Sequence, residues 1–250
     1  MRPWILVIVS LAVVWPHGVA DAKCKSPRAF FTVPSDARVP ANPVIHLFTP
    51  RRHAPAGKAP PPLNIVAHDA TGRRAVPVTV LETTHAPSFE ASAVQALTIN
   101  LGDIVFRVTG LSPRFEATAT VKVVASFAPP SGTPVTIRRT EAESFFWTCS
   151  RQHSRNLTPS IVAPAYRVVW ASSRTAFDAG KRQSFIVPDA MGGFFGVDAE
   201  SKAVVELGTS NCIGRTFDFA GRHAWVALQA LHADGIATPL GPPRRVSPPK

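Results

Sequence analysis

The residues that could carry chemistry are scattered along this chain, and none of them occurs in a catalytic spacing. The G-x-S-x-G motif of hydrolase serines, the H-E-x-x-H motif of zinc proteases and the glycine-rich loops that hold phosphates are all absent. Seven histidines follow residue 22, and no two of them lie four residues apart, so their spacing predicts no metal site. We therefore expect a protein that is not an enzyme and that holds no metal or cofactor.

One pair of carboxylates has a spacing that could serve acid–base chemistry. Glu141 and Glu143 are two residues apart, which puts both side chains on one face of a strand. Arg138 and Arg139 stand beside them in the sequence, and basic neighbours favour a surface ion-pair cluster over a catalytic pair.

Several aromatic side chains are candidates for binding a glycan or a peptide. Phe194 and Phe195 are flanked by glycines in the segment Gly192–Gly196, a pattern typical of aromatics displayed on loops, and Trp225 is a further candidate. Burial of such side chains in a core is the alternative interpretation.

The start of the chain predicts export. Arg2 precedes an apolar run from Trp4 to Trp15, and Ala20-Asp21-Ala22 is an A-x-A cleavage site. The run has about 12 residues, whereas a membrane-spanning helix needs about 20. We therefore expect residues 1–22 to be a cleaved signal peptide. The mature protein would be secreted, periplasmic or on the cell surface, without spanning a membrane.

If the protein is exported, its three cysteines can form a disulfide, because an oxidising compartment permits disulfides. Cys149 and Cys212 both fall in the second half of the chain, each near the end of a predicted strand, and we predict that they pair. Closing a loop of about 64 residues would stabilise the fold by roughly 4 kcal/mol in the chain-entropy model. Cys24 is then the odd cysteine: it is either free near the new terminus or takes a partner from the pair.

The charge of the chain indicates the kind of partner. A formal net charge of +11 suits an anionic envelope polymer, such as an acidic glycan or lipopolysaccharide, and another surface protein is the alternative partner. The arginine pairs are dispersed and lack the interleaved aromatics of a single-strand-binding surface, so we expect no nucleic acid partner.

The elements that would position these residues are predicted to be short strands. The chain has 25 prolines and no long helical periodicity, and short runs rich in Val, Thr, Phe and Ala recur along it. After a leading segment at 23–33, we expect strands at 44–48, 63–68, 76–82, 96–101, 104–109 and 118–127. After a proline-rich linker at 128–134, we expect strands at 135–139, 143–149, 165–171, 184–187, 194–197, 203–207 and 224–231. The predicted organisation is one domain over 23–127, a second over 135–238, and a disordered tail over 239–250.

Three features resemble known families of β-sandwich. Pro34 to Asn42 reads P-x-D-x-x-V-P-x-N and resembles the opening of bacterial immunoglobulin-like domains. Leu111-Ser112-Pro113 is similar to a corner of fibronectin type III domains, and Cys149, Trp170 and Cys212 follow the Cys…Trp…Cys order of immunoglobulin domains. Two departures are that Trp170 stands 21 residues after Cys149 and that Ser210 occupies the place of the corner tyrosine.

The resemblance implies an all-β fold with two tandem antiparallel sandwiches, immunoglobulin-like or fibronectin type III-like. It further implies a non-catalytic exported protein with a role in adhesion, envelope structure or recognition. The alternative function is a secreted module that binds carbohydrate or an envelope polymer.

Overall fold

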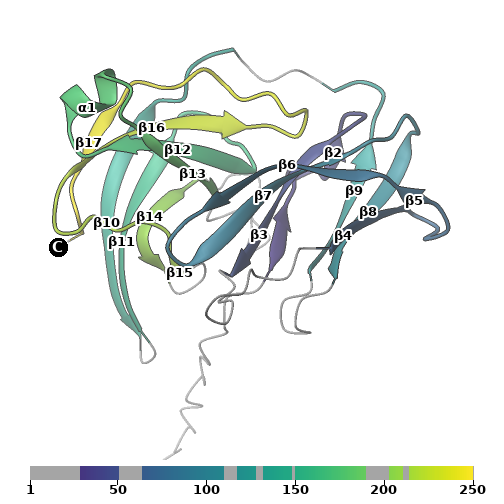
Figure 1. The fold of residues 1–250 in the computed structure, drawn as a ribbon, viewed down its shortest axis with the longest axis horizontal. Helices are drawn as coiled ribbons and strands as arrows, with labels where there is room; N and C mark the ends of the chain where they lie inside the picture. The colour runs from purple at the N-terminus through teal and green to yellow at the C-terminus, as the bar shows by residue number, and fades with distance from the viewer. Residues whose placement is uncertain are drawn as a thin grey trace, which may run out of the picture.

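The computed structural model describes residues 29–50, 64–109, 117–127, 132–147, 150–189, 203–210 and 214–249 (Figure 1). The described residues form four β-sheets, arranged as two sandwiches, with a single short helix. The prediction of an all-β fold with two tandem antiparallel sandwiches is therefore confirmed.

The first sandwich has the strand order of an immunoglobulin domain. Its strands are β1 (Phe30–Thr32), β2 (Arg38–Val39), β3 (Val44–Pro50), β4 (Asn64–Asp69), β5 (Ala75–Val76), β6 (Val78–His85), β7 (Phe89–Ala96), β8 (Gly102–Thr109) and β9 (Ala117–Val123). One sheet has the order β1-β3-β7-β6 and the other β2-β9-β8-β4-β5. In immunoglobulin lettering these are A-B-E-D and A′-G-F-C-C′, with the short β2 running parallel to β9. Ile45, Leu47, Val94, Phe106 and Val121 fill the space between the sheets.

The second sandwich likewise consists of two packed sheets, and its described part has one strand fewer than the first. Its strands are β10 (Ile137–Trp147), β11 (Ser150–Pro159), β12 (Ala165–Ala171), β13 (Gln183–Pro188), β14 (Val205–Ser210), β15 (Gly214–Arg215), β16 (Ala224–Leu231) and β17 (Arg244–Val246). The two sheets have the orders β10-β11-β14-β15 and β13-β12-β16-β17, and the helix α1 (Arg174–Asp178) lies against the second of them. The central strands β12 and β16 supply Tyr166, Val168, Val226 and Leu228 to the core.

The two sandwiches pack directly on each other. Along β3, Ile45 and Leu47 point into the first core, while Phe48 packs into the core of the second sandwich together with Phe89 and Ala91 of β7. The inner strands β3 and β7 of this sheet are thus covered on both faces, which is why β3 is buried almost without interruption. Figure 1 shows β6 and β7 running up to β13.

Backbone hydrogen bonds also join the sandwiches. The Val44 N–H donates to the Ala233 carbonyl at 2.7 Å, and the Ser88 N–H donates to the Arg215 carbonyl at 3.0 Å. The Arg215 N–H donates in return to Ser88 Oγ at 2.7 Å. The two sandwiches are therefore fixed against each other through the main chain as well as through side chains.

One predicted strand is wrong and a neighbouring strand escaped prediction. The segment 96–101 was expected to be a strand, but the strand is β7, which ends at Ala96. Half of the β7 residues are alanine or serine, which have low intrinsic β-propensity. They fit because β7 lies between β3 and β6 with both faces covered, where packing outweighs propensity.

Other corrections concern the second half of the chain. The two strands expected at 135–139 and 143–149 are the single strand β10, and its partner β11 was not foreseen. The tail expected to be disordered from residue 239 forms β17, which pairs with β16, and Arg155 donates two hydrogen bonds to the carbonyls of Ser247 and Pro248. Beyond the expected linker, Val135 is fully buried and bridges to Leu228, so the chain turns directly into the second core.

Candidate functional site

Of the carboxylate pair considered for acid–base chemistry, Glu141 lies on the surface, while the side chain of Glu143 falls outside the described part of the structure. Glu141 is exposed and forms an ion pair with Arg139 at 2.5 Å, as expected for a surface ion pair. Among the described residues, no three His, Cys, Asp or Glu side chains come together as a metal-binding group.

Among the histidines that the structure describes, His46 alone is deeply buried, and it lies at the interface of the sandwiches. His46 projects from β3, and burial, followed by the positive charge of Arg167, lowers its pKa to about 4. The imidazole is therefore neutral at pH 7, and it sits in a packed interface without access to a substrate.

Several predicted sites lie outside the described residues: the signal peptide 1–22, Cys24, Cys149, Cys212, Phe194 and Phe195. The described strands that flank Cys149 and Cys212, namely β10, β11, β14 and β15, all belong to one sheet. Immunoglobulin cystines instead join facing sheets under a tryptophan. Trp170 packs edge-to-face on Phe217, with ring centroids 4.9 Å apart.

Trp225, the predicted binding aromatic that the structure does describe, is half-buried beside α1. It lies on the outer face of β16 and packs against a small cluster formed by Val169, Ala171, Phe177 and Ala227. The Arg174 guanidinium carbon lies 5.5 Å from the centre of the Trp225 ring. Arg245 of β17 stands directly opposite Trp225 in the register, so its side chain leaves the sheet on the same face.

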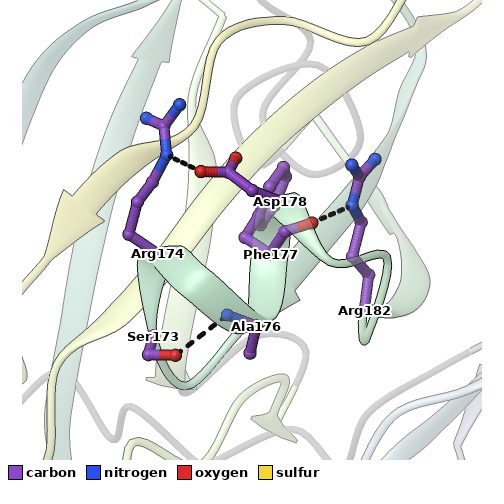
Figure 2. A network of polar contacts seen from close by, with 6 residues as sticks. All are labelled: Ser173, Arg174, Ala176, Phe177, Asp178 and Arg182. Carbon is purple, nitrogen blue, oxygen red and sulfur yellow. Dashed lines mark hydrogen bonds and ion pairs between the residues drawn. The ribbon is translucent and has the colours of Figure 1, made fainter.

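The helix α1 holds the arginines of this face in place (Figure 2). The Ala176 N–H donates to Ser173 Oγ at 3.1 Å, which caps the first turn, and Arg174 Nε donates to Asp178 Oδ2 at 2.7 Å. At the other end, Arg182 Nε donates to the Phe177 carbonyl at 2.6 Å. In Figure 2 both guanidinium groups point upward, Arg174 from the helix and Arg182 from the segment after it. Five residues of helix are too few for a periodic signal in the sequence, so this element was not foreseen.

A cleft of about 470 Å³ opens at the end of the first sandwich. It is formed by the turn between β4 and β5, the segment between β7 and β8, and Asn42. Three apolar side chains of the β7–β8 segment are exposed here: Leu97 at 47%, Ile99 at 90% and Leu101 at 64%. Their alternation with Thr98 and Asn100 is the pattern that predicted a strand. In the structure the segment 97–101 is not a strand, and its apolar side chains are exposed to solvent.

The polar side of the cleft is built around Asp69. Its Oδ1 accepts hydrogen bonds from Thr71 Oγ1 at 2.7 Å and from the Arg73 N–H at 3.1 Å. The Thr71 hydroxyl, ahead of the backbone N–H groups, lowers the pKa of the Asp69 carboxyl below its ordinary value. On the opposite side, the Thr98 N–H donates to Asn42 Oδ1 at 2.9 Å, which anchors the apolar segment to the loop before β3.

No protein-family model and no curated protein matches the chain. Solved structures found to be similar include a pullulanase from Anoxybacillus sp. LM18-11 (9% identity, TM-score 0.26) and domains A168–A170 of titin (12% identity, TM-score 0.24). The matches cover 85% and 88% of this chain, and 24% and 65% of the respective structures. Both TM-scores are too low to show a shared fold, so the fold assignment rests on the strand order above.

The described residues contain no helix of the length and apolar character that crossing a membrane requires.

Proposed function

We propose that this chain is an exported, non-catalytic recognition protein that binds its partner at the cleft of the first sandwich. The observation that carries the proposal is the row of exposed apolar side chains, Leu97, Ile99 and Leu101, at the mouth of the cleft. Single exposed apolar residues are common on protein surfaces, whereas several gathered at a concavity are typical of an interaction site.

The polar groups of the cleft support binding more than catalysis. Its lining contains two carboxylates, Asp69 and Asp103, and two threonines, but no serine, cysteine, histidine or lysine. Asp69 is kept ionised by the hydrogen bonds of its own turn, which disfavours a role as a general acid. The lining groups that remain can orient a ligand through hydrogen bonds.

The packing of the two sandwiches supports a role in presentation. A flexible tandem would let the cleft move freely, whereas here the first sandwich is fixed to the second through Phe48, Phe89 and the hydrogen bonds around Ser88. The cleft therefore has one orientation relative to the rest of the molecule, as suits adhesion or recognition at a cell surface.

Two measurements on the chain from residue 23 onward test this function. We expect the protein to be retained on specific features of peptide and glycan arrays, and to give no turnover of peptide, ester and glycoside libraries above buffer. Turnover well above buffer would contradict the non-catalytic role. Export is tested by fractionating cells that express the full chain: we expect the protein outside the cytoplasm with residues 1–22 removed.

A further inference from the structure

We infer that the face around Trp225 on the second sandwich is a binding site for an acidic polysaccharide. This surface, hereafter the Trp225 face, consists of Trp225, Arg174, Arg182 and Arg245. It lies on the other sandwich from the cleft, and it shares with the proposed function only the expectation of export.

The three arginines surround one aromatic cluster. Arg174 lies over the Trp225 ring, and Arg182 lies over the Phe177 ring with its guanidinium carbon 4.5 Å from the ring centre. Phe177 and Trp225 belong to the same small cluster under α1. Arg245 enters from β17 on the Trp225 side. Three cations from α1, the segment after it and β17 thus converge on one face of the sheet.

Each of these guanidinium groups keeps donors for a ligand. Arg174 donates to Asp178 through Nε, and Arg182 donates to the Phe177 carbonyl through Nε. Both residues are exposed, and their terminal nitrogens form no hydrogen bond with another described residue. Within the described part of the chain, the Arg245 side chain forms no hydrogen bond or ion pair. A guanidinium presents its donors as a planar fork that matches carboxylate and sulfate oxygens.

The neighbouring Arg244 shows what an arginine with a structural role looks like here. It points to the opposite side of β17, and its Nη1 donates to the Ile137 carbonyl at 2.7 Å, which ties β17 to β10. The Arg245 side chain forms no such hydrogen bond, so its guanidinium group is available to bind a partner.

Charge and shape select the class of partner. Asp178 is the only acidic side chain of α1, and Arg174 already neutralises it, so the Trp225 face is positive in a chain of net charge +11. Nucleic acid would need aromatic rings free for stacking, but Phe177 is buried and Trp225 is half-buried under Arg174. A sugar needs only the accessible part of the ring for its C–H groups, while its carboxylates or sulfates meet the arginines.

The test is titration of the chain from residue 23 onward with heparin and with polygalacturonate at 50 mM NaCl. Neutral dextran and single-stranded DNA serve as comparison ligands. We expect the triple variant R174Q/R182Q/R245Q to bind both acidic polysaccharides at least tenfold more weakly than the wild type, because it removes the charged hydrogen-bond donors of the Trp225 face. The matched control R38Q/R73Q/R107Q removes the same charge from exposed positions of the first sandwich and should keep its affinity within about twofold.

The single variant R245Q is less exposed to loss of structure than the triple variant, because the Arg245 side chain forms no hydrogen bond or ion pair with another described residue. We expect it to weaken binding by about threefold with an unchanged melting temperature. Equal losses in the two triple variants would overturn the inference, because binding would then follow net charge alone. It would also be overturned if dextran or single-stranded DNA bound as tightly as the acidic polysaccharides with the same dependence on the three arginines. Ile99→Asp changes the cleft and leaves the Trp225 face intact, so it should bind both polysaccharides as the wild type does. A result against recognition at the cleft is thereby distinguished from a result against the Trp225 face.

Discussion

Arg167 on β12 of the second sandwich forms an ion pair with Glu82 on β6 of the first. The two side chains remain about one-third exposed, so the pair by itself contributes modestly to stability. Its position is more informative, since it lies at the border of an interface that also buries His46, Phe48 and Phe89. The two sandwiches are therefore joined by a buried apolar interface with an ion pair at its border.

Acid should loosen the molecule through His46. The pKa of its imidazole is about 4 in the folded protein and about 6.5 in the unfolded chain, so the unfolded chain binds the proton first as the pH falls. The folded state is therefore not penalised above pH 6.5 and loses stability progressively between pH 6.5 and 4, by a total of about 3 kcal/mol. Urea unfolding at several pH values measures this loss. The variant His46→Gln should lose less stability over the same window, and an identical pH dependence in wild type and variant would show that His46 is not responsible.

The interface should make unfolding cooperative across both sandwiches. Phe48 belongs to a strand of the first sandwich but is buried in the core of the second. Truncation in Phe48→Ala should cost about 3–5 kcal/mol. We expect calorimetry to show one transition in the wild type and one, at lower temperature, in the variant. Two separate transitions, with only one of them shifted by the substitution, would mean that the sandwiches unfold independently.

Gly208 occupies a position in β14 where we expect no other residue type to be tolerated. Its φ is +125°, and a Cβ built there would collide with the His153 carbonyl oxygen of the neighbouring strand β11. Gly208→Ala should therefore destabilise by about 2 kcal/mol or more. Gly72, with φ +70° and open space around the Cβ position, provides the comparison. Gly72→Ala should cost about 1 kcal/mol. Equal losses in urea unfolding for the two variants would contradict this account.

Part of the fold follows from the sequence because local patterns and packing agree. In β12 the alternation of Tyr166, Val168 and Trp170 marks the buried face, and the strand was predicted with its exact bounds. In β7 the small side chains of Ala91 and Ala93 carry no such signal, because their suitability depends on the neighbours β3 and β6. The prolines around β17 suggested disorder, while pairing with β16 decides the outcome.

The candidate sites were less accessible to prediction for the same reason. The cleft is lined by Asn42, Asp69 and Ile99, which are far apart in the sequence and come together only in the folded sheets. Trp225 was singled out by its type, but its arginine neighbours come from β17 and from a helix about 50 residues earlier in the chain.

The cysteine pair stays a prediction, and the flanking strands sharpen it. β11 begins at Ser150, next to Cys149, and β14 ends at Ser210, two residues before Cys212, while β11 and β14 pair with His153 opposite Thr209. We expect oxidised protein from residue 23 onward to yield a Cys149–Cys212 peptide in non-reducing mass spectrometry, with Cys24 free to react with a thiol reagent. A Cys24–Cys212 link would contradict the pairing. Replacing both partners by serine should cost about 2–4 kcal/mol.

Recognition at the cleft is the central claim, and matched variants on peptide and glycan arrays test it most directly. Ile99→Asp places a charge at the mouth of the cleft, whereas Val162→Asp places the same charge on the second sandwich, at a side chain that is 67% exposed. We predict that the features bound by the wild type are lost by Ile99→Asp and kept by Val162→Asp, with both variants folded. Retention of every feature by Ile99→Asp, or arrays on which the wild type binds nothing, would contradict the claim.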